Sequence, residues 1–173
     1  MPFSIISAMD SKRGIGKNNS IPWHIPEDFQ WFKKQTTNKI VIMGDTTYYS
    51  LPEKTRPLPN RINIVLTLDD EKVKPLEDEG CIVMRSVKEV YDKYKNEDCF
   101  IIGGGKIYLE FLSLSDKMYL TFIKGNFECD TFFPLFDKKI WKIIYRTQYG
   151  VSKKGYKYSF NIIERMNYTL AKD

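Results

Sequence analysis

Short apolar runs recur along the chain and are separated by polar or amphipathic segments. Short runs that are rich in β-branched residues are typical of buried strands, whereas helices need longer segments with a period of about 3.6 residues. Several of these runs end at a glycine or a polar turn, which marks the end of a strand. The pattern therefore predicts strands at residues 3–9, 39–43, 62–66, 81–84, 100–102 and 118–123.

Three segments between these runs have helical features. Pro26 suits the first position of a helix, because its missing N–H is not needed there. Ser86 and Glu89 have the spacing of a capping box, which predicts the start of a second helix. Residues 106–112 are amphipathic and follow a glycine run, so we expect a third helix there.

The last two apolar stretches, residues 141–149 and 156–165, alternate apolar and polar positions and have no helix between them. They predict an antiparallel hairpin with its loop at residues 150–155. Strands that alternate with short helices earlier in the chain favour an open α/β sheet. We therefore expect an α/β fold with a mainly parallel central sheet, an antiparallel C-terminal edge hairpin and flanking helices.

Composition and charge narrow the class of protein. A length of 173 residues suits one domain, which we expect to span residues 1–173. The hydrophobic fraction of 42% and the aromatic fraction of 14% are those of a globular protein rather than a disordered one. The net charge is +5, but the basic residues are scattered and form no nucleic-acid-binding stripe. This distribution suits a small anionic ligand and equally suits no ligand.

Few residues are able to bind a metal or act as a catalytic base. The cysteines at 81, 99 and 129 form no CxxC pair, and His24 is the only histidine. A Cys/His metal site and a triad with another histidine are therefore excluded, and we expect no metal. Cys81 and Cys99 begin apolar runs, which indicates core residues in a reducing compartment. No run approaches a membrane span and no leader pattern occurs, so we expect a cytoplasmic protein.

Asp28 is a carboxylate set among aromatic and apolar residues at the start of the first predicted helix. Trp31 and Phe32 follow at helical spacings, so they share its face. A carboxylate beside aromatic rings is suited to holding a cationic or amide-like heterocycle. The alternative is that Glu27 and Asp28 only complement the helix dipole.

Two strand-to-helix junctions offer sites for an anionic ligand. The glycines at 103–105 follow a predicted strand and allow a phosphate to approach the backbone closely. Residues 44–47 form a second junction, and two such junctions in one sheet suit a dinucleotide. A glycine run can also be a tight turn. Arg61 is similarly either a two-pronged clamp for a carboxylate or a solvated surface residue.

Six groups of residues occur in one order along the chain, and together they are far more specific than any one alone. They are Gly14-Ile15-Gly16 with Ile21-Pro22-Trp23, Asp28 with Trp31-Phe32-Lys33, Val41-Ile42-Met43-Gly44, Arg56-Pro57-Leu58-Pro59-Asn60-Arg61, Ile102-Gly103-Gly104-Gly105 with Ile107-Tyr108, and Asp130-Thr131-Phe132-Phe133-Pro134. On these segments the chain resembles the dihydrofolate reductase family over nearly its whole length. The resemblance implies that family's three-layer fold and an NADPH-dependent hydride transfer to 7,8-dihydrofolate, giving 5,6,7,8-tetrahydrofolate for one-carbon metabolism and thymidylate synthesis.

The resemblance also implies roles for individual residues. Asp28 would bind the pterin's 2-amino group and N3 and promote protonation at N5, with Thr121 supporting it and Trp23 ordering a water. Arg61 would bind the α-carboxylate of the glutamate tail. Residues 10–23 would form a loop that closes over the nicotinamide. The other substrate-binding residues implied are Ile6, Ala8, Ile21, Phe32, Lys33, Leu51, Arg56 and Ile102.

The implied cofactor site is built around the two glycine junctions, and the Gly103–Gly104 peptide bond is expected to be cis. Its residues would be Ala8, Ile15, Gly16, Gly44, Asp45, Thr46, Thr47, Thr67, Arg85, Gly103, Gly104, Gly105, Lys106, Ile107 and Tyr108. Asp45 departs from the family, which usually has a basic residue here that contacts the 2′-phosphate. An acid repels that phosphate and is able to accept a hydrogen bond from a free 2′-hydroxyl. Alternatively, Asp45 caps the helix.

We therefore expect NADPH as the cofactor, with lowered specificity over NADH. Two rival interpretations are a related reductase of the riboflavin pathway and a binding protein that has lost turnover. The first is not expected to combine Trp23 and Asp28 with Arg61, and the intact Asp28, Trp23 and Thr121 argue against the second. We expect a monomer whose partners are dihydrofolate and antifolates, with no nucleic acid and no membrane.

Overall fold

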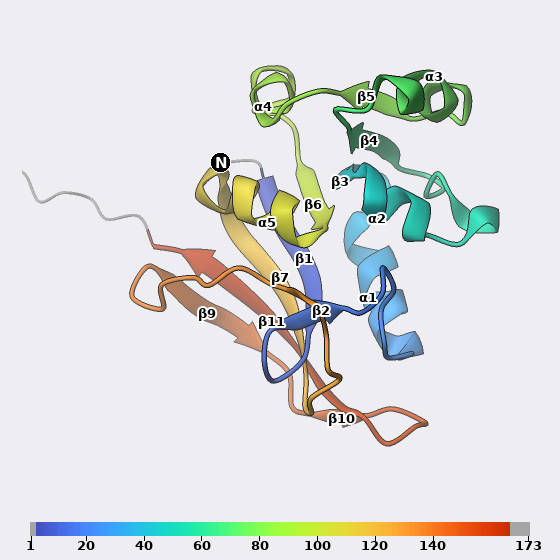
Figure 1. Ribbon diagram of the computed structural model, residues 1–173. Helices are drawn as coiled ribbons and strands as arrows, with labels where there is room; N and C mark the ends of the chain where they lie inside the picture. Colours follow the sequence, from blue (N-terminus) through green and yellow to red (C-terminus); the bar gives the residue numbers. More distant parts are fainter. Residues whose placement is uncertain (1–2, 167–173) are drawn as a thin grey trace, which may run out of the picture.

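The computed structural model describes residues 3–166 (Figure 1). Its main sheet has the strand order β10-β11-β7-β1-β6-β3-β4-β5, and β9 also pairs with β11. These strands are β1 (Phe3–Met9), β3 (Ile40–Gly44), β4 (Ile62–Leu66), β5 (Ile82–Met84), β6 (Cys99–Gly103), β7 (Ser115–Ile123), β9 (Trp141–Arg146), β10 (Gly150–Val151) and β11 (Lys157–Arg165). Strands β1 and β3 to β7 pair in parallel, whereas β11 is antiparallel to β7, β9 and β10. The expected mainly parallel sheet with an antiparallel C-terminal edge is confirmed.

Helices lie on both faces of the sheet and make a three-layer arrangement (Figure 1). They are α1 (Pro26–Thr36), α2 (Asp45–Ser50), α3 (Asp70–Asp78), α4 (Val87–Tyr94) and α5 (Gly105–Phe111), with short 3-10 helices η1 (Glu53–Thr55) and η2 (Leu112–Leu114). Residues of α4 and α5 pack into one buried cluster, and residues of α1, α2 and α3 pack into another on the opposite face. The sheet therefore separates two hydrophobic cores.

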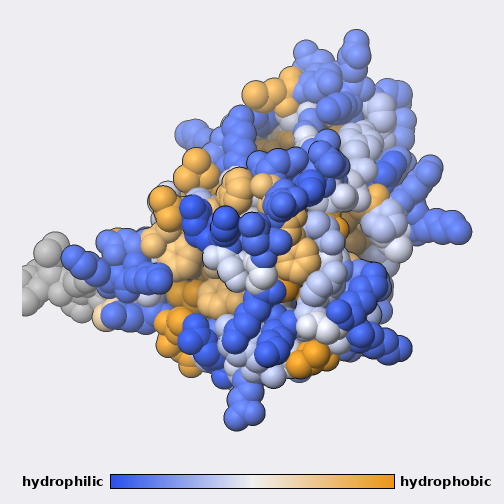
Figure 2. Space-filling view, turned by 60° about the horizontal axis from the view of Figure 1, so that its bottom comes forward, coloured by the Kyte–Doolittle hydropathy of each residue, from blue (hydrophilic) through white to orange (hydrophobic). Residues whose placement is uncertain are grey.

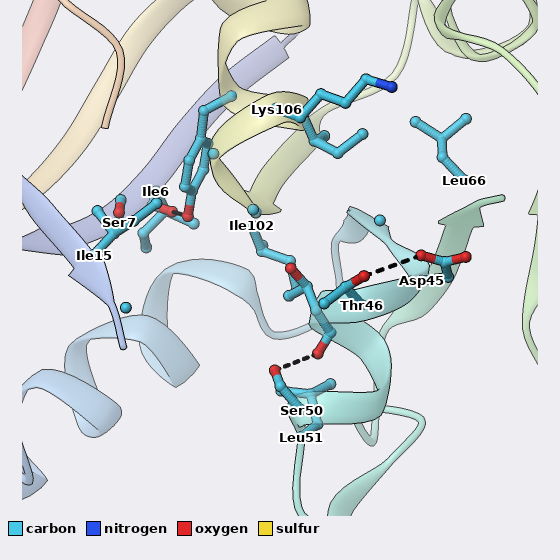
Figure 3. A pocket seen from close by; sticks show the side chains of 18 of the residues that line it. Ile6, Ser7, Ile15, Asp45, Thr46, Ser50, Leu51, Leu66, Ile102 and Lys106 are labelled. Atoms are coloured by element: carbon cyan, nitrogen blue, oxygen red, sulfur yellow. Dashed lines mark hydrogen bonds between the residues drawn. The ribbon is translucent and has the colours of Figure 1, made fainter. Parts of the chain in front are cut away.

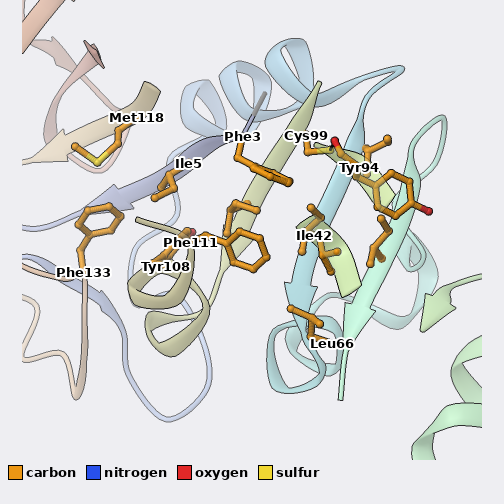
Figure 4. Close-up of a cluster of buried hydrophobic side chains, with 14 of the residues drawn as sticks. Phe3, Ile5, Ile42, Leu66, Tyr94, Cys99, Tyr108, Phe111, Met118 and Phe133 are labelled. Carbon is orange, nitrogen blue, oxygen red and sulfur yellow. Dashed lines mark hydrogen bonds between the residues drawn. The ribbon is translucent and has the colours of Figure 1, made fainter. Parts of the chain in front are cut away.

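Strand β3 shows why the sheet needs both layers. Its side chains alternate between the two faces, so Ile40 and Ile42 enter the α4–α5 cluster while Val41 and Met43 enter the α1–α3 cluster. A strand that is apolar at every position is stable only when both faces are covered. In the α4–α5 cluster, drawn in Figure 4, the ring of Phe3 on β1 meets that of Phe111 on α5, with centroids 5.6 Å apart.

The C-terminal hairpin differs from the prediction. A continuous strand was expected at residues 141–149, but β9 stops at Arg146 and a second short strand, β10, begins at Gly150 inside the predicted loop. Both pair with β11, whose pairing with β9 has a register shift between Ile162 and Ile163. A Cβ at Gly150 would lie 2.8 Å from the Tyr158 ring, so the close approach of β10 to β11 depends on this glycine.

Three local features were missed or only half predicted. Helix α3 was not expected, because Leu76 is its only buried residue and a proline lies inside it. The two-stranded ribbon of β2 (Gly14–Gly16) and β8 (Thr131–Phe132) joins segments that no local pattern connects. The capping box is half formed: the Ser86 hydroxyl accepts from the Glu89 N–H, but the Glu89 carboxylate accepts from the N–H of Arg85.

The surface is polar over most of its outline. In Figure 2, hydrophilic side chains make up most of the outline, and hydrophobic residues are visible between them and at a few places on the outline. No helix within residues 3–166 is long and apolar enough to cross a membrane. Within the same residues, no group of three or more His, Cys, Asp or Glu side chains is placed to hold a metal ion.

Candidate active site

A cavity of about 1410 Å³ opens along the carboxyl ends of the central parallel strands. Its walls come from β1, β3, β4 and β6 and from helices α1, α2 and α5. In Figure 3, Ile102 lies between Ile6 and Ile15 on one side and Asp45 and Thr46 on the other. Sites for one small molecule have volumes of roughly 300–1,000 Å³. This cavity is therefore large enough to hold two ligands side by side.

Asp28 lies in the first turn of α1 and faces this cavity. The hydroxyl of Thr121, a buried residue of β7, donates a hydrogen bond of 2.6 Å to its Oδ1. Burial raises the pKa of Asp28 to about 6 from the ordinary 3.8, and the bond from Thr121 offsets part of that rise. The carboxyl is therefore able to change its protonation state close to neutral pH.

Apolar residues surround Asp28 and form a narrow slot. Trp31 stacks on Phe160 with ring centroids 4.5 Å apart and planes at 9°, which holds this face of α1 against the end of the sheet. The other expected substrate-binding residues on this side reach the cavity from β1, α1, β6 and the loops. They are Ile6, Ala8, Ile21, Phe32, Lys33, Leu51 and Ile102, and all of them line it.

Arg61 is a fixed cation on the wall of the same half of the cavity. Its Nη1 donates to the Thr36 hydroxyl at 3.0 Å, its Nε donates to the Pro59 carbonyl at 2.9 Å, and its guanidinium lies 6.0 Å from the centre of the Phe32 ring. Burial lowers the pKa of Arg61, but a guanidinium remains charged at any ordinary pH. Arg61 therefore offers a permanent positive charge to the acidic tail of a ligand.

Three of the expected site residues do not line the cavity. Thr121 donates a hydrogen bond to Asp28 but does not border the cavity itself. Trp23 is buried and packs edge-on against Phe127, with ring centroids 5.1 Å apart. Arg56 donates to the backbone carbonyls of Tyr49 in α2 and of Leu51 just after it, and it lies over tyrosine rings. Its guanidinium is therefore held beside the wall of the cavity rather than on it.

The second half of the cavity contains both glycine junctions. All the expected cofactor residues line it, namely Ala8, Ile15, Gly16, Gly44, Asp45, Thr46, Thr47, Thr67, Arg85, Gly103, Gly104, Gly105, Lys106, Ile107 and Tyr108. The Gly103–Gly104 peptide bond is cis, as expected. A Cβ at Gly104 would lie 3.2 Å from the Thr47 hydroxyl, and one at Gly105 would lie 3.1 Å from the Phe132 carbonyl. A side chain at either position would therefore press against neighbouring protein atoms.

Asp45 does not cap α2, so that alternative is wrong. The cap position belongs to Gly44, and no side chain caps the helix. Instead, Asp45 Oδ2 accepts a hydrogen bond of 2.8 Å from the Thr67 hydroxyl and lies 3.2 Å from the Lys72 ammonium. Burial alone would raise the pKa of Asp45, but the bonds from Thr67 and Lys72 outweigh it and hold the pKa below its usual value. The acid is therefore ionised, and its charge is largely balanced.

Sequence reasoning missed several residues in this half of the cavity. Lys72, which does not line the cavity but pairs with the lining residue Asp45, was overlooked because it lies on the unpredicted helix α3. Ser86 and Lys88 line the cavity beside Arg85, and the capping box was a signal that the start of a helix lies there. Arg85 itself donates to the Leu68 carbonyl at 2.9 Å and pairs with an exposed acid on α3. This end of the cavity therefore holds more cations than the sequence alone indicated.

The parallel sheet, the two glycine junctions and an acid with a raised pKa in a two-ligand cavity define an α/β oxidoreductase that binds a dinucleotide beside its substrate. Comparison with known proteins agrees. The family model described as dihydrofolate reductase matches residues 2–165. Dihydrofolate reductase of Bacillus subtilis is 42% identical over 166 residues, covering 95% of each chain, and that of Haemophilus influenzae is 40% identical over 144 residues, covering 83% of this chain and 85% of the other.

A solved structure of dihydrofolate reductase from Enterococcus faecalis, complexed with NADP(H) and RAB-propyl, superposes with a TM-score of 0.83 at 32% identity. The alignment covers 95% of this chain and 96% of that one. The chain belongs to the dihydrofolate reductase family, the NADPH-dependent oxidoreductases that convert dihydrofolate to tetrahydrofolate.

Proposed function

We propose that Asp28 is the acid of this reductase: it orients the pterin of 7,8-dihydrofolate and promotes protonation at N5. The proposal rests on the surroundings of Asp28. Its carboxyl faces the cavity, accepts a hydrogen bond from the Thr121 hydroxyl and has a pKa of about 6. A group with that pKa is present in both forms near neutral pH. It is thus able to accept hydrogen bonds from the 2-amino group and N3 and to hold the proton that N5 needs.

The two ends of the substrate match the apolar part and the positively charged part of this half of the cavity. The apolar slot of Ile6, Phe32 and Leu51 excludes water from the pterin and from the benzoyl portion that follows it. Arg61, held by Thr36 and the Pro59 carbonyl, presents a charged fork to the α-carboxylate of the glutamate tail. Lys33 adds an exposed cation to the same end.

The chain's residues fit NADPH in the other half. NADPH supplies the hydride for C6, and the protein binds it, orients it and keeps water away. Gly104 and Gly105 line the cavity and carry no side chain, which supports a close approach of the pyrophosphate. Thr46 and Thr47 at the start of α2 offer hydroxyl and N–H donors. Arg85 and Lys106 supply positive charge for the phosphates.

We propose that the preference for NADPH over NADH is reduced in this chain. Asp45 is ionised in the half of the cavity that would hold the adenosine end of the cofactor, and it repels a 2′-phosphate. Its pairing with Lys72 at 3.2 Å lessens that repulsion, which supports a lowered rather than a reversed preference.

The experiment that tests the acid is an assay of NADPH oxidation in the presence of dihydrofolate, run on the wild type, Asp28→Asn and Glu27→Gln. Glu27 is the neighbouring carboxylate in the same helical turn and is the matched control. We expect Asp28→Asn to lose about 10²- to 10⁴-fold in turnover, while Glu27→Gln keeps it. Wild-type protein that binds methotrexate without oxidising NADPH would instead be a binding protein, and equal loss in both variants would contradict the role of Asp28.

We further propose that residues 1–173 form one domain that acts as a monomer in the cytoplasm and binds no nucleic acid. All three cysteines are free, which suits a reducing compartment. Light scattering coupled to size-exclusion chromatography tests the monomer, and a particle of twice the chain mass of 20.4 kDa would contradict it.

A further inference from the structure

A second buried carboxylate, Asp10, lies outside the cavity and is not used by the proposed mechanism. It directly follows β1, and its side chain accepts from four donors on two separate segments. Its Oδ1 accepts from the N–H groups of Lys12 at 2.9 Å and Gly14 at 2.8 Å. Its Oδ2 accepts from the N–H of Phe127 at 3.1 Å and from the thiol of Cys129, with sulfur and oxygen 3.7 Å apart.

These donors belong to two stretches that pack against each other: residues 11–21, named here the cover segment, and residues 124–131, the facing loop. Ser11 and Gly125 exchange a pair of hydrogen bonds, with the Ser11 N–H donating to the Gly125 carbonyl at 3.0 Å and the Gly125 N–H to the Ser11 hydroxyl at 2.9 Å. The Asp130 N–H donates to the Gly16 carbonyl at 3.0 Å. Asp10 is the buried centre of this contact, because both stretches donate to one carboxylate.

Gly14 is what lets the two stretches meet. A Cβ at this position would lie 2.6 Å from both Cβ and Sγ of Cys129 and 2.9 Å from Asp10 Oδ2, distances that real Cβ atoms essentially never show. The φ of Gly14 is not in the left-handed region, so its backbone conformation does not require glycine. Glycine is required here only because the space between Cys129 and Asp10 is too small for a Cβ atom.

The joined stretches carry residues of both halves of the active site. Ile15 and Gly16 of the cover segment line the cavity, as does Thr131 of the facing loop. At the glycine junction, the Cβ position of Gly105 is 3.8 Å from Ile15 Cδ1 and 3.2 Å from Thr131 Cγ2. On the substrate side, the Phe127 ring packs against Trp23, whose backbone follows the cover segment. The Asp10 carboxylate therefore contributes to holding two parts of the site in place: the wall of the cofactor site, and Phe127, which supports Trp23.

We propose that Asp10 is a positioning residue for the reductase: its buried carboxylate fixes the cover segment and the facing loop in the arrangement that binds NADPH. The inference rests on the proposed function and adds a residue to it. An ionised carboxylate suits the position because it only accepts, and four donors converge on its two oxygens. An amide there would aim an NH₂ group at two of those donors and leave buried N–H groups unsatisfied.

The first test compares Asp10→Asn with Glu128→Gln. Glu128 is exposed and joins the same two stretches through a surface ion pair with Lys17 at 3.8 Å, so its variant is a matched loss of one charge. The readout is the Kd for NADPH, measured by fluorescence on folded protein well below the melting temperature. We expect Asp10→Asn to raise that Kd by about tenfold and Glu128→Gln to leave it within about twofold.

The pH dependence of turnover separates positioning from direct chemistry. The midpoint set by Asp28 should be the same in Asp10→Asn as in the wild type, because Asp10 does not face the cavity. A folded Asp10→Asn protein that binds NADPH as tightly as the wild type would overturn the proposal, whatever its melting temperature. Because the readout is NADPH binding, a wild type that binds NADPH but does not turn over dihydrofolate would refute the proposed function without deciding the role of Asp10.

A second pair of variants decides the matter if Asp10→Asn does not fold. Gly14→Ala inserts a methyl group between Cys129 and Asp10, and Gly14→Ala with Cys129→Gly removes the two atoms at 2.6 Å. We expect the single variant to weaken NADPH binding by about fivefold and the double variant to recover most of that loss, with Cys129→Gly alone as the reference. Wild-type affinity in Gly14→Ala, or no recovery in the double variant, would overturn the proposal.

Discussion

Asp28 is a residue whose pH behaviour follows directly from its surroundings. Its pKa is raised to about 6, and the protonated form is the one that holds the proton for N5. We therefore expect the rate of hydride transfer to be constant below about pH 6 and to fall about tenfold per pH unit above it. Single-turnover kinetics with deuterated NADPH as a function of pH measure this, and a rate that rises with pH would contradict the assignment.

Thr121 adjusts that pKa through one hydrogen bond. Its hydroxyl donates to Asp28 Oδ1 at 2.6 Å and so stabilises the ionised carboxylate. Thr121→Val removes the donor at nearly constant volume, and we expect the midpoint of the pH–rate profile to move up by about one unit. Thr121→Ser keeps the hydroxyl and should leave the midpoint in place. A downward shift in the valine variant would show that the bond favours the neutral acid.

Asp45 is expected to set part of the cofactor preference. Asp45→Asn removes a charge, keeps an oxygen that accepts from Thr67 and frees Lys72 for a phosphate. We expect the ratio of kcat/KM for NADPH to that for NADH to rise by about five- to tenfold. Asp69→Asn is the control, because Asp69 lies 3.9 Å from the same lysine but does not line the cavity. An equal change in both variants would assign the effect to Lys72 alone.

The elements around the cavity depend on backbone conformations that few residues adopt. Gly103, at the end of β6, has a φ of +130°, and a Cβ there would meet Thr47 and Tyr108 at 3.4 Å. We expect Gly103→Ala to lower the free energy of unfolding by about 2 kcal/mol and to weaken NADPH binding. Gly155→Ala, at a φ of +85° with open space around it, should cost about 1 kcal/mol and leave binding unchanged. Unchanged NADPH binding in Gly103→Ala would contradict the role of this junction.

The predictions of helices and strands were correct where the pattern within a single segment was sufficient. The buried strands, helix α1 with Pro26 at its first turn and the start of α4 all follow from local periodicity and end signals. Helix α3 buries only Leu76, so its apolar signal was too weak to detect. The break between β9 and β10 depends on how Gly150 meets Tyr158 across the hairpin, which no single segment contains.

The stability of the whole molecule should also depend on Asp28. Because its pKa is higher in the folded state than the ordinary 3.8, the folded protein holds the proton more tightly than the unfolded chain. The stability that this adds is complete below about pH 4 and is lost as the pH rises through about 6. We expect ligand-free Asp28→Asn to be more stable than the wild type by about 2 to 3 kcal/mol at neutral pH, with the difference shrinking toward pH 4.

Urea unfolding of the ligand-free proteins across this pH range measures the difference, and Glu27→Gln is the control for loss of a charge in the same turn. The predicted single domain also implies one cooperative transition. An asparagine variant with no advantage at neutral pH would show that burying the carboxylate carries no cost, and two separate transitions would contradict a single domain.

The sequence by itself determined the type and order of most elements, the positions of both glycine junctions and more than half of the residues that line the cavity. These follow from interactions within a few positions, such as apolar periodicity, proline and glycine geometry and capping, or from a specific order of motifs. Only the tertiary structure decided that Asp45 is paired with Lys72, 27 positions away, and that Asp10 bonds Cys129, 119 positions away. The physical reason is that a side chain's charge balance and hydrogen-bond partners are set by the segments that packing brings against it, and no pattern within one segment contains them.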